Sequence, residues 1–96
     1  MLVEETPEYR EWFKEQSKSD QAQISARVVR IKEYNHLGDT RYLGEQLAEI
    51  RWKSGRRIYF ALVGKDSVLF VFGGTKNGQK KDIEKARLIL KRHAGS

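Results

Sequence analysis

The stretch LAEIRWKSGRRIYFAL, residues 47–62, decides the fold. Apolar and polar side chains alternate along its first part with the period of two that is typical of a β-strand. Ala48, Ile50 and Trp52 point one way, while Glu49 and Arg51 point the other. The three-residue connection at 53–55 ends in glycine, as many hairpin loops do. The stretch therefore predicts two antiparallel strands joined by this loop.

The second strand of the hairpin continues the alternation. It predicts Ile58, Phe60 and Leu62 facing the core and Arg57, Tyr59 and Ala61 facing outward. Two registers keep the apolar face intact: one pairs Arg51 with Arg57, and the other pairs Lys53 with Arg57. Either register places two cations directly opposite each other, which destabilises a sheet by about 0.2–1 kcal/mol. We therefore expect an anion to bind between them.

The segments around the hairpin complete the sheet. Residues 68–72 are apolar on both faces, which is typical of a central strand covered on both sides, and Gly73-Gly74 is expected to end it. Leu2–Val3 is a candidate edge strand.

Three helices are predicted. Thr6-Pro7-Glu8 is a helix start, and this helix is expected to run to about Gln16. A second helix spans 20–34, with Asp20 as its cap and an apolar stripe of Ile24, Val28 and Ile31. A loop at 35–39 leads into the sheet. The last helix spans 79–93 and has Ile83, Ala86 or Arg87, and Leu90 at core spacing. The expected fold is α+β: residues 1–96 form a single domain in which an N-terminal helical hairpin packs on a small, mainly antiparallel sheet with a C-terminal helix.

Composition narrows the class of protein. The 96 residues carry a net charge of +6 and no cysteine, which excludes disulfides and thiolate metal sites. Residues 1–50 hold 7 basic and 10 acidic residues, whereas residues 51–96 hold 12 and 3, a net charge of +9. This asymmetry indicates a polyanion-binding face, most often one for nucleic acid. The absence of a signal peptide or a long apolar run predicts a cytoplasmic protein without a membrane partner.

The segment GGTKNGQ, residues 73–79, has the glycine spacing of a P-loop. Gln79-Lys80 replaces the Lys-Ser/Thr pair that holds phosphate and magnesium, so an NTPase is excluded. The start of a helix flanked by Lys76, Lys80 and Lys81 remains a candidate phosphate site.

Metal chemistry is not expected. The acidic residues of the basic half, Asp66, Asp82 and Glu84, do not converge, and His36 and His93 lack partners at ligand spacing. No metal and no small-molecule cofactor are therefore predicted.

Three motifs resemble the RelE/ParE superfamily, and within it the HigB-like addiction module killer proteins. They are Glu-x-Arg in Leu47-Ala48-Glu49-Ile50-Arg51, Gly-x-Arg-x-Tyr-Phe in Gly55-Arg56-Arg57-Ile58-Tyr59-Phe60, and Gly-Gly-x-Lys followed by Gln-x-x-Asp-Ile at residues 73–83. The resemblance covers about residues 7–92 in the family's order of elements.

The resemblance implies the toxin of a type II toxin–antitoxin pair. The best-known members of the family cut mRNA in the ribosomal A site, and a small DNA-binding antitoxin, here expected to be a HigA-like helix-turn-helix protein, blocks the toxin. The motif positions make Arg51, Arg57 and Lys76 the catalytic candidates, and either Tyr59 or Lys76 the general base. The expected RNA- and phosphate-binding residues are Lys53, Arg56, Gln79, Lys80 and Lys81.

Three functions remain open at this point. The first is a metal-independent endoribonuclease that acts on ribosome-bound mRNA through the RNA's own 2′-hydroxyl. The second is a ParE-like inhibitor of DNA gyrase that has no nuclease activity. The third is an inactive relative that binds RNA or a partner.

Overall fold

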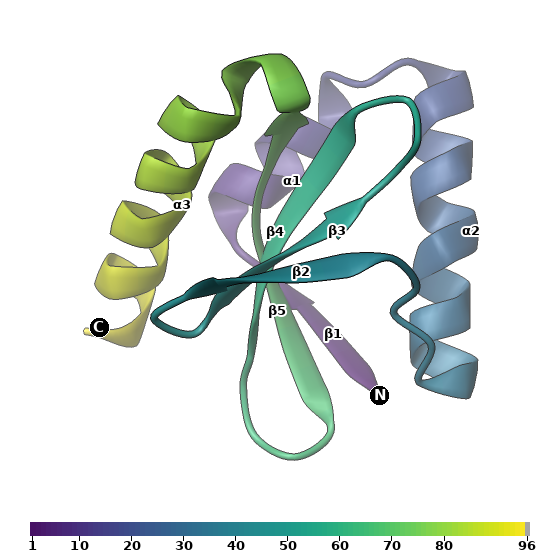
Figure 1. Ribbon diagram of the computed structural model, residues 1–96. Helices are drawn as coiled ribbons and strands as arrows, with labels where there is room; N and C mark the ends of the chain where they lie inside the picture. The colour runs from purple at the N-terminus through teal and green to yellow at the C-terminus, as the bar shows by residue number, and fades with distance from the viewer. Residues whose placement is uncertain (96) are drawn as a thin grey trace.

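The computed structural model describes residues 1–95 as three helices packed on one five-stranded sheet (Figure 1). The strand order is β1-β5-β4-β3-β2, with β1 parallel to β5 and the other neighbours antiparallel. The α+β class and the mainly antiparallel sheet are thus confirmed. The elements are β1 (Leu2–Glu5), α1 (Pro7–Lys14), α2 (Lys18–Tyr34), β2 (Thr40–Gly44), β3 (Leu47–Arg51), β4 (Arg56–Leu62), β5 (Ser67–Thr75), a 3₁₀ turn η1 (Lys76–Gly78) and α3 (Gln79–Ala94).

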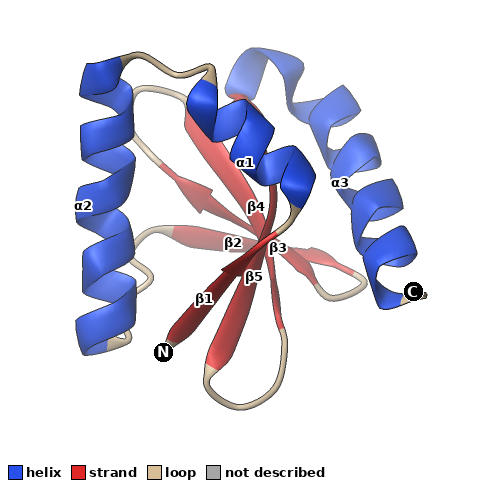
Figure 2. Cartoon of the chain, turned by 180° about the vertical axis from the view of Figure 1, so that it is seen from behind, coloured by secondary structure: helices blue, strands red, loops and turns tan. Residues whose placement is uncertain are grey.

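Helices cover both faces of the sheet. In the view of Figure 2, α1 crosses in front of the strands while α2 and α3 flank them on opposite sides. One core cluster lies under α1 and α2 and contains Tyr9, Ile24, Ile31, Ile50, Ile58, Phe60, Val68 and Phe70. The other lies under α3 and contains Leu47, Tyr59, Leu69, Val71, Ala86 and Ile89. The predicted double coverage of the central strand is confirmed.

This double coverage corrects two assignments on β4. Tyr59 and Ala61, expected to face outward, are buried because α3 covers the face on which they lie. Leu62, expected to face the core, is 64% exposed. It lies at the end of β4, where the β4–β5 hairpin extends beyond the helices (Figure 1).

The helix starts depend on hydroxyl side chains. Thr6 Oγ1 accepts a hydrogen bond from the N–H of Tyr9 and donates one to the carbonyl of Val71, so it both caps α1 and ties it to β5. The cap of α2 is Ser17, whose Oγ accepts from the N–H of Asp20. The prediction of Asp20 as the cap was therefore wrong by one turn. The carboxylate of Asp20 instead pairs with Arg56. Helix α1 ends at Lys14, two residues before the predicted end.

Gly73 and Gly74 do not end β5, which continues to Thr75. A Cβ on Gly73 would lie 2.3 Å from the Trp12 ring, and one on Gly74 would lie 2.0 Å from Asp82 Oδ2. The two glycines therefore let α1 and α3 approach opposite faces of the same strand. The sequence pattern had instead predicted that they end the strand.

Helix α3 buries Ala86 and Ile89 rather than Arg87. Arg87 donates to the carbonyls of Leu43 and Gly44 and so fastens α3 to the end of β2. Within residues 1–95, no helix combines the length and apolar character needed to cross a membrane.

Ile31→Ala should lower the free energy of unfolding by about 2–5 kcal/mol, because it leaves a cavity beneath α2 where the side chain is fully buried. Val29→Ala on the same helix is the control: Val29 is 48% exposed, and its truncation should change stability by less than about 0.5 kcal/mol. Urea unfolding of both variants measures the difference, and equal losses would contradict this packing.

Candidate functional site

Arg51 and Arg57 lie directly opposite each other on β3 and β4. This confirms the first of the two registers considered, in which Ile50 also pairs with Ile58. On the other side of β4, Arg57 pairs with Gly74 of β5. The two arginines thus share the α3 face of the sheet at one end, close to the segment that enters α3.

The guanidinium of Arg57 is held along two of its edges. Its Nη1 donates to the carbonyls of Trp52, at 3.3 Å, and Arg56, at 3.0 Å. Its Nε faces Glu49 Oε2 at 3.7 Å. Its Nη2 has no hydrogen-bond partner among residues 1–95, and the side chain is 13% exposed. Arg57 is therefore a fixed cation with one edge left for a ligand.

The strand pattern misplaced Glu49, which contacts Arg57 and Gln79. The pattern put it on an outward face, yet its side chain is fully buried. Oε1 accepts a hydrogen bond from Gln79 Nε2 at 2.9 Å, and Oε2 faces Arg57 Nε at 3.7 Å. The amide of Gln79 is therefore directed at Glu49 rather than at solvent, which removes it from the expected RNA-binding set. A glutamate in a strand covered on both faces was the signal that could have identified this pair.

Tyr59 does not fit the role of a general base. Its side chain is fully buried, and its hydroxyl has no hydrogen-bond partner among residues 1–95. Burial raises the pKa of Tyr59 well above the ordinary value of 10.0, and the nearby carboxylates of Asp82 and Glu49 raise it further. A general base has to reach the proton that it accepts. The structure thus makes Tyr59 a core residue.

Arg56 is likewise engaged inside the protein. Its Nη2 donates to Asp20 Oδ1 at 2.7 Å, its Nη1 donates to Gln23 Oε1 at 3.2 Å, and the residue is only 8% exposed. Its guanidinium also lies 5.2 Å from the centre of the Trp52 ring, and that of Arg27 lies 4.4 Å from the same ring. Arg56 therefore joins the hairpin to α2 and does not face a phosphate.

Three lysines at the entry to α3 are exposed: Lys76, Lys80 and Lys81. The backbone N–H of Lys76 donates to the carbonyl of Gly55, and its side-chain stem lies 3.3 Å from where a Cβ of Gly55 would be. Gly55 also has a φ of +104°, so a larger residue would be strained there as well as crowded. This contact places the lysine of η1 beside the β3–β4 loop.

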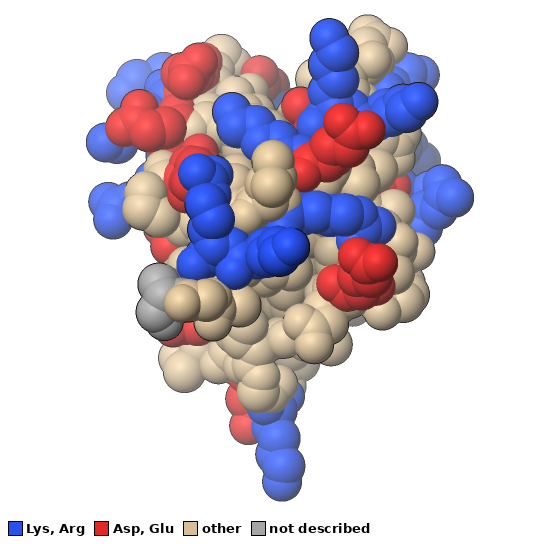
Figure 3. Space-filling model, turned by 90° about the vertical axis from the view of Figure 1, so that its left-hand side faces the viewer, with Lys and Arg blue, Asp and Glu red and all other residues tan. Residues whose placement is uncertain are grey.

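Asp82 changes what the start of α3 can offer to an anion. Its carboxylate lies between Gly74 and Gly78, 3.1 Å from where a Cβ of Gly78 would be. A negative charge is thus already present beside this helix terminus, so the lysine side chains, rather than backbone N–H groups, are what this segment presents to phosphate. Figure 3 views the α3 side, where Lys and Arg side chains run across the middle of the face among Asp and Glu side chains.

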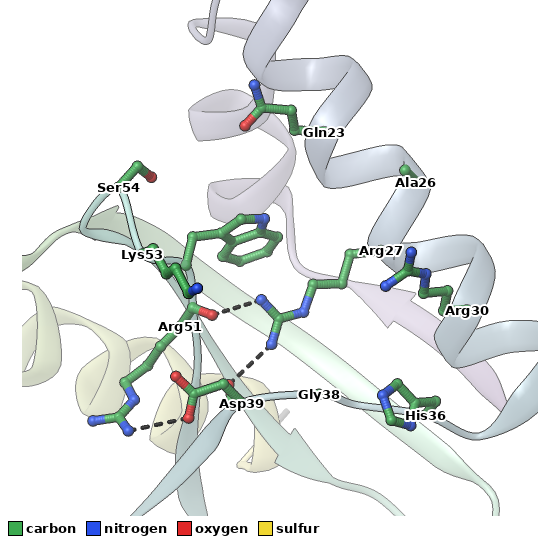
Figure 4. A pocket seen from close by; sticks show the side chains of 11 residues that line it. Gln23, Ala26, Arg27, Arg30, His36, Gly38, Asp39, Arg51, Lys53 and Ser54 are labelled. Carbon is green, nitrogen blue, oxygen red and sulfur yellow. Dashed lines mark hydrogen bonds and ion pairs between the residues drawn. The ribbon is translucent and has the colours of Figure 1, made fainter.

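A groove lies between α2 and the β3–β4 loop (Figure 4). Four of its lining residues are basic, namely Arg27, Arg30, Arg51 and Lys53, and one, Asp39, is acidic. Arg27 is structural, because it donates to the carbonyls of Leu37, Asp39 and Arg51. Arg51 pairs with Asp39 at 3.1 Å. Through Arg51 the groove adjoins Arg57, so Arg51, Lys53, Arg57 and Lys76 form a basic edge at this end of the sheet.

The structure therefore separates the predicted site residues into two sets. Arg51, Lys53, Arg57 and Lys76 gather at the basic edge, with Lys80 and Lys81 exposed nearby on the first turn of α3. Arg56, Tyr59 and Gln79 are used internally. Among residues 1–95, no three His, Asp or Glu side chains come together as a metal-binding group.

The arrangement of helices and sheet is that of the RelE toxins. The chain is similar to an arginine double mutant of the Escherichia coli toxin RelE in the free state, with a TM-score of 0.71, 15% identity and 95% of each chain covered. It is also similar to isolated E. coli RelE, with a TM-score of 0.65 and 11% identity. That match covers 88% of this chain and 96% of the RelE chain. A chain of the intact E. coli RelBE toxin–antitoxin complex is similar as well, with a TM-score of 0.65 and 13% identity, and the match covers 77% of this chain and 94% of that one. The chain therefore shares the fold of these RelE structures.

In sequence, the chain is 31% identical over 70 residues to an "Uncharacterized protein" of Haemophilus influenzae. The match covers 71% of this chain and 70% of that protein, and the chain belongs to the same family. No protein-family model matches it. Its place in the HigB-like branch stays a prediction.

The pKa of Asp82 predicts how stability depends on pH. Burial raises this pKa above the ordinary value of 3.8, and Lys85 lowers it in part. The folded state then binds the proton more tightly than the unfolded state, so this carboxyl costs stability as the pH rises from its unfolded pKa through its raised folded pKa. Asp82→Asn should gain stability relative to the wild type over that interval.

Urea unfolding at a series of pH values from about 3 to 7 tests this expectation. Asp66→Asn, in the exposed β4–β5 loop, is the matched control for the loss of one carboxylate. A difference between wild type and Asp82→Asn that does not change with pH would contradict the assignment.

Proposed function

We propose that this protein is the toxin of a type II toxin–antitoxin pair and that it cleaves ribosome-bound mRNA in the cytoplasm without a metal ion. The observation that carries the proposal is the pair of arginines at the basic edge, directly opposite each other, with Arg57 fixed and one of its edges free. The shared RelE fold supports the same proposal.

The chemistry follows from what these residues supply. The 2′-hydroxyl of the RNA attacks the adjacent phosphorus, the bond to the 5′-oxygen of the next nucleotide breaks, and a 2′,3′-cyclic phosphate remains upstream. Arg51 and Arg57 hold the non-bridging oxygens as negative charge accumulates on them. Each preorganised donor of this kind contributes on the order of 3 kcal/mol in the transition state.

The proton of the 2′-hydroxyl requires an acceptor within reach. Since Tyr59 is enclosed in the core, the side-chain amine of Lys76 is the remaining candidate of the two considered, and water protonates the departing 5′-oxygen. Lys53 lines the groove beside Arg51, while Lys80 and Lys81 are exposed on α3, and all three suit contacts to flanking phosphates. Alignment of the RNA by the ribosome supplies a further part of the rate.

An antitoxin is the second partner that we propose. The solved RelBE structure is a toxin–antitoxin complex of a protein with this fold. The net charge of +9 on residues 51–96 suits a partner with an acidic surface. We expect a HigA-like helix-turn-helix protein, whose co-expression should restore growth to cells that produce this chain.

Arg57→Ala and Lys76→Ala should each abolish growth arrest and lower the rate of mRNA cleavage on translating ribosomes by about 100-fold or more, because each removes a group at the reacting phosphate. Lys65→Ala is the matched control: Lys65 is exposed in the β4–β5 loop, and its variant should keep full activity. Growth arrest by both site variants at equal protein levels would overturn the site assignment.

A supercoiling assay run beside the ribosome assay separates the candidate functions. Loss of gyrase activity with intact mRNA would replace the proposal with a ParE-like inhibitor. Neither effect, together with binding to RNA or a partner, would indicate an inactive relative.

Substitution of a single 2′-deoxynucleotide before the scissile bond should abolish cleavage at that bond, because the nucleophile is then missing. Cleavage of the all-ribose substrate should leave a 2′,3′-cyclic phosphate, and chelation of metal should not slow it provided that the ribosomes stay intact. End-group analysis of the fragments measures both features, and cutting of the deoxy substrate would exclude this mechanism.

A further inference from the structure

We propose that Glu49 and Gln79 are positioning residues that hold the guanidinium of Arg57 in its reactive orientation and set the distance between Arg57 and Lys76. The inference rests on the proposed function, since it assigns these roles within the same site. Neither residue touches the RNA in this account. They act through Arg57 and Lys76, which do.

The position of Glu49 needs an explanation beyond stability. The residue pairs with Tyr59 across the two strands, and the core cluster on the same face is otherwise apolar. Removing a carboxylate from water carries a large free-energy cost unless it is paired and hydrogen-bonded, and an apolar residue at such a position is often at least as stable. Because a domain of only 96 residues accepts the free-energy cost of burying this carboxylate, we infer that the charge has a function.

The geometry shows what the charge can do. With Nη1 bonded to two carbonyls and Nε turned toward the carboxylate, the planar guanidinium of Arg57 can present only its Nη2 edge outward. Glu49 Oε2 and Arg57 Nε are both buried, neither has a hydrogen-bond partner in the described part of the chain, and they face each other at 3.7 Å. The attraction between the two charges therefore determines the orientation of the arginine.

Gln79 extends this control to the lysine. It is the first residue of α3 and directly follows the 3₁₀ turn that begins with Lys76. Its hydrogen bond to Glu49 Oε1, at 2.9 Å, ties the start of α3 to β3. The same carboxylate thus contacts the arginine on one side and the helix that carries the lysine on the other.

The test is Glu49→Gln, which keeps the shape and can still hydrogen-bond to Gln79 but lacks the charge that attracts Arg57. We expect the rate of mRNA cleavage at saturating toxin to fall about 10- to 100-fold, as for a misplaced reacting group. The toxin concentration that gives the half-maximal rate should change less than about threefold, and urea unfolding should remain cooperative. Gln79→Ala should likewise lower the rate at saturating toxin while changing the half-maximal concentration little. It serves as the second variant if Glu49→Gln does not fold.

Glu33→Gln is the matched control, because Glu33 is exposed on α2 and its variant should cleave at the wild-type rate. If the wild type cleaves and both Glu49→Gln and Gln79→Ala cleave equally fast, this inference is overturned while the proposed function stands. A change confined to the half-maximal concentration would also overturn it, because that indicates a role in binding. If the wild type itself does not cleave mRNA, the proposed function fails, and the assigned roles fail with it.

Discussion

The carboxylate of Glu49 lies in the layer between the sheet and α3, fully buried, and much of the arrangement at this end of the molecule follows from satisfying it. One oxygen accepts a hydrogen bond from Gln79, the first residue of α3, and the other faces the guanidinium of Arg57 on β4. A register shift of β4 by one residue would turn Arg57 to the opposite face of the sheet. A displacement of α3 would move Gln79 out of hydrogen-bond distance of Glu49. Leaving the charge without these partners would cost several kcal/mol, so the ion pair specifies how strands and helix fit together.

The same end of the sheet is fastened to α2 by a second group of cations. Arg27 and Arg56 lie against the Trp52 ring, and Arg56 also pairs with Asp20. These arginines contribute to the high positive charge of the sequence, yet they serve packing and hydrogen bonding inside the domain. The charge available to a ligand is therefore smaller than composition indicates.

Alternation, turn residues and caps predicted the parts of the fold that local physics determines. The hairpin, the helix start at Thr6 and the double coverage of β5 were confirmed, and the hairpin adopts one of the two registers that the alternation allowed. The pattern of β4 could not show that α3 would cover its second face, and this is why Tyr59 was taken as a candidate general base. Nor could it show that the amide of Gln79, expected to bind RNA, is directed at Glu49. The roles of Gly73 and Gly74 also depend on side chains far away in the sequence, Trp12 and Asp82, which no local pattern identifies.

The central claim is that the charge of Glu49 acts through Arg57, and a double-mutant cycle on the rate of mRNA cleavage tests it most directly. The cycle compares the wild type, Glu49→Gln, Arg57→Ala and the double variant under single-turnover conditions. If Glu49 works by orienting Arg57, its substitution should have almost no further effect once the arginine is gone, so the two losses should be strongly non-additive. Additive losses, with Glu49→Gln slowing the Arg57→Ala variant as much as the wild type, would contradict the account.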